Sequence, residues 1–294
     1  MNPNHPPQFT LTHAAAIVAA LCALVALISG ALATTGATLA QPFSSGIVSA
    51  AGHTLAGEIA GTLLLAMLIW VAFREQTVRG LAWALCAMVA LQGFLGSQAL
   101  VPGPSNALGL LHAVLAQVLL AGAVAVVIAT ASAWKRTPEY IGDYGWPSLR
   151  SLAVVLPVLV LTQVVLGAAF RQRLAGLMPH IIGAMLVSLL ILIVCAFTLQ
   201  QCPAHTLLRA SAKTLMVATF TQIFLGIAAF TVRALPNQDA GPVLGFTGGH
   251  VTVGALTLAA SIVLSMQIRR NVLPKGTTLP QVPSIQSSGP QPQD

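Results

Sequence analysis

Long apolar stretches recur along the chain and are separated by short segments that carry most of its charged residues. Eight stretches can be recognised, at about 13–36, 47–73, 80–100, 107–133, 149–170, 177–200, 207–231 and 245–268. A helix needs about 20 apolar residues to cross the hydrocarbon core of a bilayer, and each stretch is long enough. The alternating segments of about 10 residues that form transmembrane strands are absent from the sequence. The pattern predicts an all-α membrane protein with eight transmembrane helices.

Composition and charge agree with a membrane protein and exclude a nucleic-acid-binding one. Hydrophobic residues make up 56% of the chain and charged residues only 6%, with a mean hydropathy of +0.86. The net charge of +7 is unevenly distributed between the two sides of the predicted membrane. Most basic residues lie on the side of the N-terminus: Arg74, Arg79, Lys135, Arg136, Arg150, Arg209, Lys213, Arg269, Arg270 and Lys275. By the positive-inside rule this side is cytoplasmic, which predicts a multi-pass protein of a bacterial-type inner membrane with both termini in the cytoplasm.

Three odd-numbered stretches share the short motif Q-x-x-L-G, which indicates an internal repeat. It occurs at Gln92 to Gly96, at Gln163 to Gly167 and at Gln222 to Gly226, and the first stretch has the weaker counterpart Ser29-Gly30. The chain therefore consists either of a helix pair repeated four times or of two tandem four-helix bundles. The predicted halves are 1–136 and 148–270, followed by a tail, 274–294, that is rich in Pro, Gln and Ser and is expected to be disordered.

Each even-numbered stretch has one histidine near its start, on the side opposite most of the basic residues. These residues are His53, His112, His180 and His250. A histidine within a membrane span is costly unless it has a partner, so each indicates function. Four histidines at matching repeat positions favour two pairs of axial haem ligands on facing helices. Interhelical hydrogen bonding, a proton relay and a non-haem metal site are weaker interpretations, since the spans contain a single acidic residue, Glu58.

Other polar residues distinguish the two predicted halves. The only basic residues on the histidine side are Arg171, Arg173 and Arg233, all in the second half, where they are suited to bind the anionic propionates of a haem. In the first half, Glu58 follows His53 by five residues and Gln117 follows His112 by five residues. We expect Glu58 and Gln117 to steer a proton or water if the first half is catalytic.

The chain resembles the haem A synthase family over nearly its whole length. Two segments are similar to the outer-loop signature G-A-x-x-R…G-x-G/A-G-L of that family. One runs from Gly30-Ala31-Leu32 to Gly36, and the other comprises Leu166-Gly167-Ala168-Ala169-Phe170-Arg171 followed by Ala175-Gly176-Leu177. The resemblance implies eight spans in two four-helix halves, with the histidine pairs on the even-numbered spans.

The resemblance also implies a function for each half. His180 and His250 would bind a resident haem b, and His53 and His112 would be catalytic residues that bracket the substrate haem O. The enzyme would oxidise a ring methyl of haem O towards the formyl group of haem A, for maturation of cytochrome oxidase. Haem O synthase and subunits of a terminal oxidase would be its partners, in addition to the lipid bilayer.

The sequence departs from the family pattern in the first half. Ala50 and Thr54 stand where family members usually have a Glu and an Arg, Thr34 or its neighbour replaces an Arg, and Gln41-Pro42-Phe43 replaces a Cys-Pro loop. These departures leave two alternatives open. One is a non-catalytic haem carrier or oxidase assembly factor, and the other is a di-haem electron-transfer protein that reacts with quinol.

Overall fold

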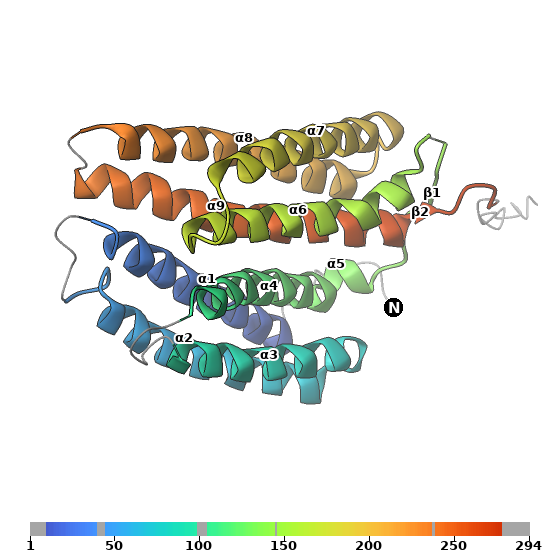
Figure 1. The fold of residues 1–294 in the computed structure, drawn as a ribbon. Helices are drawn as coiled ribbons and strands as arrows, with labels where there is room; N and C mark the ends of the chain where they lie inside the picture. Colours follow the sequence, from blue (N-terminus) through green and yellow to red (C-terminus); the bar gives the residue numbers. More distant parts are fainter. Residues whose placement is uncertain (1–9, 40–44, 99–104, 145, 237–238, 278–294) are drawn as a thin grey trace, which may run out of the picture.

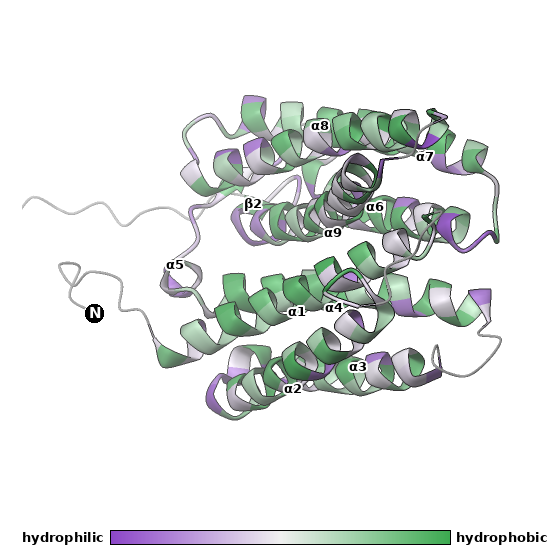
Figure 2. Cartoon of the chain, turned by 90° about the vertical axis from the view of Figure 1, so that its left-hand side faces the viewer, coloured by the Kyte–Doolittle hydropathy of each residue, from purple (hydrophilic) through white to green (hydrophobic). Residues whose placement is uncertain are grey.

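The computed structural model describes residues 10–39, 45–98, 105–144, 146–236 and 239–277, and it is built almost entirely of helices (Figure 1). In these residues, eight helices are long and apolar enough to cross a membrane. The prediction of an all-α membrane protein with eight spans is confirmed. Figure 2 shows hydrophobic residues along the helices and many of the hydrophilic ones near the helix ends.

The elements follow one another in the order of the predicted stretches. The first group contains α1 (Leu11–Gly36), α2 (Ala50–Arg74), the 3-10 turn η1 (Gln76–Val78), α3 (Arg79–Gln98), α4 (Asn106–Thr130) and the short α5 (Ser132–Lys135). The second contains β1 (Ile141–Gly142), α6 (Leu149–Arg171), α7 (Leu177–Gln201), α8 (Thr206–Ala234), α9 (Ala240–Asn271) and β2 (Val272–Leu273). The segment Gln41-Pro42-Phe43 and residues 278–294 of the predicted tail lie outside the described residues.

Hydroxyl side chains set the start of several spans. Thr10, Ser49, Ser105 and Ser148 precede α1, α2, α4 and α6, and each accepts a hydrogen bond from a backbone N–H of the first helical turn. Each such bond satisfies one of the amide groups that a helix leaves without an internal partner at its N-terminus. The helix boundaries on both sides of the membrane therefore follow from local sequence.

Two spans differ from their predicted bounds. Helix α4 ends at Thr130 because Ala131 adopts an extended backbone conformation, with ψ of 143°. Helix α9 begins at Ala240, about five residues before the predicted stretch, because Pro242 lies in its first turn, where proline is compatible with a helix. His250 therefore lies about three turns into α9, whereas His53 and His180 lie in the first turns of α2 and α7.

The helices form two groups that meet along a shared face (Figure 1). In the first group α1 and α3 each pack against α2 and α4, and in the second α6 and α8 each pack against α7 and α9. One cluster of buried apolar residues lies mostly in the first group and the other mostly in the second, with Ala255 of α9 in the first cluster and Ala121 of α4 in the second. Helix α9 joins the groups, because it also packs against α1 and α4.

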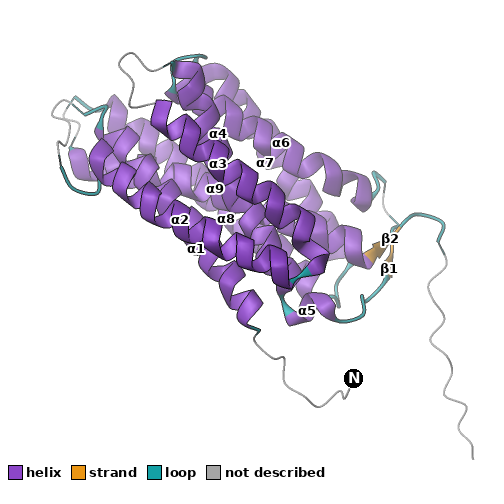
Figure 3. Cartoon of the chain, turned by 90° about the horizontal axis from the view of Figure 1, so that it is seen from below, coloured by secondary structure: helices purple, strands orange, loops and turns teal. Residues whose placement is uncertain are grey.

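At the end opposite the histidines, polar contacts hold the segment that precedes α6 against the start of α6 and the end of α9. Strands β1 and β2 pair in parallel at this end (Figure 3). The buried Asp143 accepts hydrogen bonds from the Ser148 hydroxyl, 2.6 Å, and from the Leu149 amide, 3.2 Å, at the start of α6. Arg150 donates to the carbonyl of Arg269, 2.8 Å, near the end of α9. The start of α6 and the end of α9 are thus held together.

Candidate functional site

The four histidines meet as two pairs, one in each helix group. The ring centroids of His53 on α2 and His112 on α4 are 6.2 Å apart, with an angle of 76° between the ring planes. The centroids of His180 on α7 and His250 on α9 are 6.1 Å apart, with an angle of 89°. The two groups of helices therefore produce nearly the same arrangement twice.

A glycine on a neighbouring helix makes room for each imidazole ring, and these glycines lie on α1, α3, α6 and α8. An added Cβ would lie 2.9 Å from the Cε1 atom of the ring at Gly30, Gly167 and Gly226, and 3.3 Å from it at Gly96. Contacts below 3.0 Å require the ring or the helix to move. Gly30 contacts His53, Gly96 contacts His112, Gly167 contacts His180 and Gly226 contacts His250. The glycine of the repeated motif is thus a steric requirement of the histidine positions.

The glutamine of the repeated motif lies beside the same rings. The Gln163 Nε2 atom is 2.9 Å from Nδ1 of His180 and donates to its carbonyl oxygen at 2.8 Å. Gln92 Nε2 lies 3.3 Å from Nε2 of His112 and donates to the His112 carbonyl at 3.2 Å. Gln222 Nε2 lies 3.4 Å from Nε2 of His250. Only the Gln163 contact to the ring is within the usual range for a hydrogen bond, about 2.7–3.2 Å.

Beside His53 a serine takes the place of the glutamine side chain: Ser29 directly precedes Gly30, and the position that matches the glutamine of the motif is Ala26. The Ser29 hydroxyl lies 2.9 Å from Nδ1 of His53 and donates its proton to the carbonyl of Ala26, 2.8 Å away. Because that proton is committed, Ser29 accepts from Nδ1–H of His53, which leaves Nε2 of His53 with a lone pair. His250 has the same tautomer, since its Nδ1 faces the Gln222 main-chain oxygen at 3.1 Å. Both rings can therefore bind a metal through Nε2.

The ring spacing fits a metal bound between each pair. Two imidazoles on opposite sides of one iron, each with a bond of about 2 Å, have their ring centres about 6 Å apart. In the part of the chain that the structure describes, no group of three or more His, Cys, Asp or Glu residues could hold a metal ion. Each pair thus offers two protein ligands, which suits a macrocycle that supplies the other ligands itself.

Arg171 and Arg233 extend from the second helix group to the end of α1 in the first group. Arg171 is half-buried and donates to the Thr35 hydroxyl at 3.3 Å, and Arg233 donates to the Thr38 hydroxyl at 3.2 Å. Arg233 also donates to Thr247 on α9, three residues before His250, at 3.2 Å. The two guanidinium groups therefore lie where the two helix groups meet. Arg173 is exposed, with φ of 58° after the end of α6.

Two further residues singled out from the sequence lie outside these contacts. Glu58 is exposed on α2, and within the described residues its carboxylate makes no hydrogen bond or ion pair. Gln117 is buried within α4. Among the other histidines, His13 joins α1 to Thr130 of α4 at 3.0 Å, and His205 accepts from the Leu208 amide at the start of α8.

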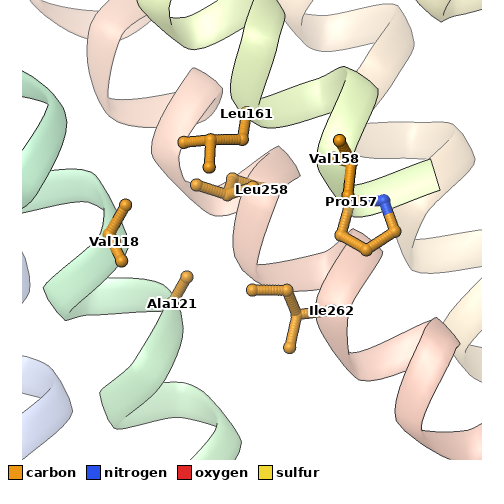
Figure 4. A pocket seen from close by; sticks show the side chains of 7 residues that line it. All are labelled: Val118, Ala121, Pro157, Val158, Leu161, Leu258 and Ile262. Carbon is orange, nitrogen blue, oxygen red and sulfur yellow. The ribbon is translucent and has the colours of Figure 1, made fainter. Parts of the chain in front are cut away.

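Two apolar cavities are lined entirely by other residues. One, of about 160 Å³, lies between α4, α6 and α9, beside Pro157 and Ile262 (Figure 4). The other, of about 290 Å³, lies between α1 and α2 and includes Cys22 and Ile59. Apart from the Cys22 thiol, their linings offer no group for acid–base chemistry or metal binding. The histidine pairs are therefore the better candidate sites.

No protein-family model matches the sequence. No curated protein matches it either. The resemblance to the haem A synthase family stays a prediction based on the residues quoted above, and the functional proposal depends on the geometry of the two histidine pairs.

Sequence reasoning identified the four histidines but missed the residues of α1, α3, α6 and α8 that contact them. The repeated motif was visible, yet its glutamine and glycine could not be assigned to a ring without the packing of the helices. Ser29-Gly30 was the least regular copy of the motif, and it contacts His53. The spacing of Gln and Gly by one helical turn was the signal that could have found them.

Proposed function

We propose that the chain is a haem protein of a bacterial-type inner membrane, with two tandem four-helix halves and both termini in the cytoplasm. The two separate apolar clusters support the division into halves. The concentration of Lys and Arg at the end opposite the histidines supports the orientation. The histidine pairs then lie near the outer surface of the membrane.

The second pair is proposed to hold a resident haem b, through His180 and His250. The observation that carries this proposal is the 6.1 Å separation of the two ring centroids, which suits axial ligation from both sides. Haem iron supplies one-electron redox chemistry when bound. Arg171 and Arg233 are proposed to bind the propionates, because arginine pairs well with carboxylates and both residues lie near this end of α9.

The first pair is proposed to bind the substrate, haem O, whose ring methyl is oxidised towards the formyl group of haem A for cytochrome oxidase. His53 and His112 orient the substrate from its two faces. One turn after His53, a Cβ added at Gly57 would meet nothing within 4 Å, so this side of α2 offers space. Glu58 and Gln117 are proposed to steer a proton or water. Haem O synthase and terminal oxidase subunits are the expected partners.

A non-catalytic haem carrier or assembly factor is the second candidate function. It is favoured by the first pair, whose helices contribute no arginine to the histidine side and have Ala50 and Thr54 beside His53. A di-haem electron-transfer protein that reacts with quinol would instead hold two haems stably. The three functions predict different haem contents.

Haem analysis of cells separates these functions. The chain is co-expressed with a haem O synthase, and haems extracted from membranes and from the purified protein are identified by chromatography with mass detection. We expect haem b in the purified protein, and haem A or its hydroxylated precursor in membranes only when the chain is present. Haem b with unchanged haem O in a competent host points to the carrier, and two stable low-spin haems point to electron transfer. A purified protein without haem contradicts the proposal.

A further inference from the structure

In α3, α6 and α8, the Q-x-x-L-G motif places an amide and a glycine on the same face of the helix, one turn apart. In all three copies this face meets the histidine of the next span: Gln92 and Gly96 meet His112, Gln163 and Gly167 meet His180, and Gln222 and Gly226 meet His250. The motif therefore accompanies three of the four histidines.

We propose that Gln163 is a positioning residue for His180. Its amide orients the imidazole and supplies the hydrogen-bond partner of Nδ1, the ring nitrogen that does not bind iron. This inference rests on the proposed haem function, and it assigns a role to a residue outside the iron ligands.

Gln163 shows the arrangement most clearly. Its Nε2 atom contacts both Nδ1 and the carbonyl oxygen of His180, at 2.9 and 2.8 Å, so that it holds the ring and the backbone of α7 together. Because Nδ1 faces the amide, Nε2 is the ring nitrogen that remains for iron, and Nδ1 then carries the proton. A hydrogen-bond partner of this kind fixes the orientation of a metal-binding histidine and tunes the metal.

The carbonyl oxygen of the Gln163 side chain supports the same role. Its Oε1 atom is buried, as are those of Gln92 and Gln222, and among the described residues none of the three has a hydrogen-bond partner. A buried polar atom without a partner is costly, so it calls for an explanation. When Nε2 binds iron, the neutral imidazole has its proton on Nδ1 and needs an acceptor. A turn of the terminal amide of Gln163 presents Oε1 to that proton, in exchange for the contacts of Nε2 with Nδ1 and the carbonyl oxygen.

Helices α7 and α9 provide space for the amides of Gln163 and Gln222. A Cβ added at Gly183, three residues after His180, would lie 2.3 Å from Oε1 of Gln163. At Gly254, four residues after His250, it would lie 3.0 Å from Nε2 of Gln222. In the second half each helix of a pair therefore has a glycine opposite the functional side chain of the other. This reciprocal fit keeps the amide beside the ring.

A purely structural role is the competing explanation. Interhelical hydrogen bonds between polar side chains contribute to helix association in membranes, by about 0.6 kcal/mol on average. Such a role predicts that loss of the amide lowers the amount of folded protein or of bound haem and leaves the electronic properties of the remaining haem unchanged. A positioning role predicts that those properties change.

The test uses the full-length protein purified in detergent, with His112→Ala as the background so that only the second pair contributes the measured haem. The midpoint potential of the bound haem is measured by redox titration for this protein and for the added substitutions Gln163→Glu and Gln163→Leu. A carboxylate accepts more strongly from Nδ1–H and makes the imidazole a stronger ligand, so we expect Glu to lower the potential. Leucine provides no acceptor, so we expect a higher potential. The matched control is Thr162→Val, at an exposed residue next to Gln163 whose hydroxyl bonds within its own helix.

The outcomes separate this inference from the proposed function. Opposite shifts for Glu and Leu, with no shift for Thr162→Val, support the positioning role. Haem with the background potential in both Gln163 variants overturns it while leaving the haem function intact. If the Gln163→Leu variant loses its haem, the midpoint potential of the Gln163→Glu variant decides. A lower potential supports the positioning role, and the background potential overturns it. If the background protein and the unsubstituted protein both lack haem, the proposed function itself has failed.

Discussion

The two histidine pairs have nearly the same ring spacing, 6.2 and 6.1 Å, but different surroundings. Glutamines flank both rings of the second pair, and two arginines lie at the same end of its helix group. In the first pair Ser29 replaces one glutamine, and the arginines that reach α1 come from the other group. One backbone arrangement thus supports two sites of different polarity.

This difference shows which part of the repeat the fold requires. A glycine faces the ring at all four histidines, because the helices approach too closely for a side chain there. The polar residue beside the ring varies between glutamine and serine without a change in ring spacing. The glycines therefore determine where the rings lie, and the polar residues can differ according to what each pair binds.

The largest expected effect comes from removing a ligand. We expect His180→Ala or His250→Ala to abolish the resident haem b, because one imidazole cannot provide both axial bonds. The haem content of each purified variant is measured by its absorption after extraction. His53→Ala serves as the comparison and should leave the second-pair haem intact. Normal haem b content in both second-pair variants would falsify the assignment.

Adding a methyl group below a ring should have the next largest effect. In Gly226→Ala the new Cβ would lie 2.9 Å from Cε1 of His250, and overpacking of this kind costs about 1–3 kcal/mol. We expect a lower melting temperature in detergent and a reduced haem content. Gly57→Ala is the matched control in the first pair, where the added Cβ meets nothing within 4 Å. Equal losses in the two variants would show that the ring contact is not the cause.

Removal of the positive charge at Arg171 or at Arg173 tests whether the two arginines contribute differently to haem binding. Arg171 is half-buried where the two groups meet, whereas Arg173 is exposed two residues later. A hydrogen bond to a charged group contributes about 1.5–3 kcal/mol, so we expect Arg171→Gln to weaken haem retention roughly tenfold or more. Arg173→Gln should change it little. The rate of haem loss during dialysis against apomyoglobin measures haem retention in both variants. Similar rates in the two variants would contradict the role of Arg171.

The smallest effect concerns the opposite end of the first group. Lys135 donates to Glu75 at 2.6 Å, and this hydrogen bond lowers the pKa of Glu75 below its ordinary value of 4.5, assisted by Thr77. A lowered pKa stabilises the folded state above pH 4.5, and that contribution disappears as the pH falls through the lower folded-state value. We expect Glu75→Gln to reduce stability at pH 7 by less than about 1 kcal/mol, since Lys135 is exposed. The difference from the unsubstituted protein should shrink as the pH falls below 4.5, as thermal melts in detergent can test, and a constant difference would exclude the ion pair as its source.

Local sequence predicted the spans well where hydropathy was uniform and less well where it was not. The bounds of α2 and α7 agree closely with the predicted stretches because both are apolar along most of their length. The start of α9 was missed because Gly241, Pro242 and Gly245 lower its hydropathy although a helix accommodates them there. Boundary errors of this kind change the depth assigned to His250 but leave its partner unchanged.

The sequence by itself determined that the chain is an all-α membrane protein with eight spans, because apolar runs of this length are stable only as helices in a bilayer. It also revealed the histidines and the repeated motif, since both lie at regular positions along the chain. Only the tertiary structure decided that His53 contacts Ser29 and Gly30, that each glutamine lies beside a particular ring, and that Arg171 reaches α1. Those contacts depend on how the helices rotate and approach one another, which is set by the packing of many side chains at once rather than by any local pattern.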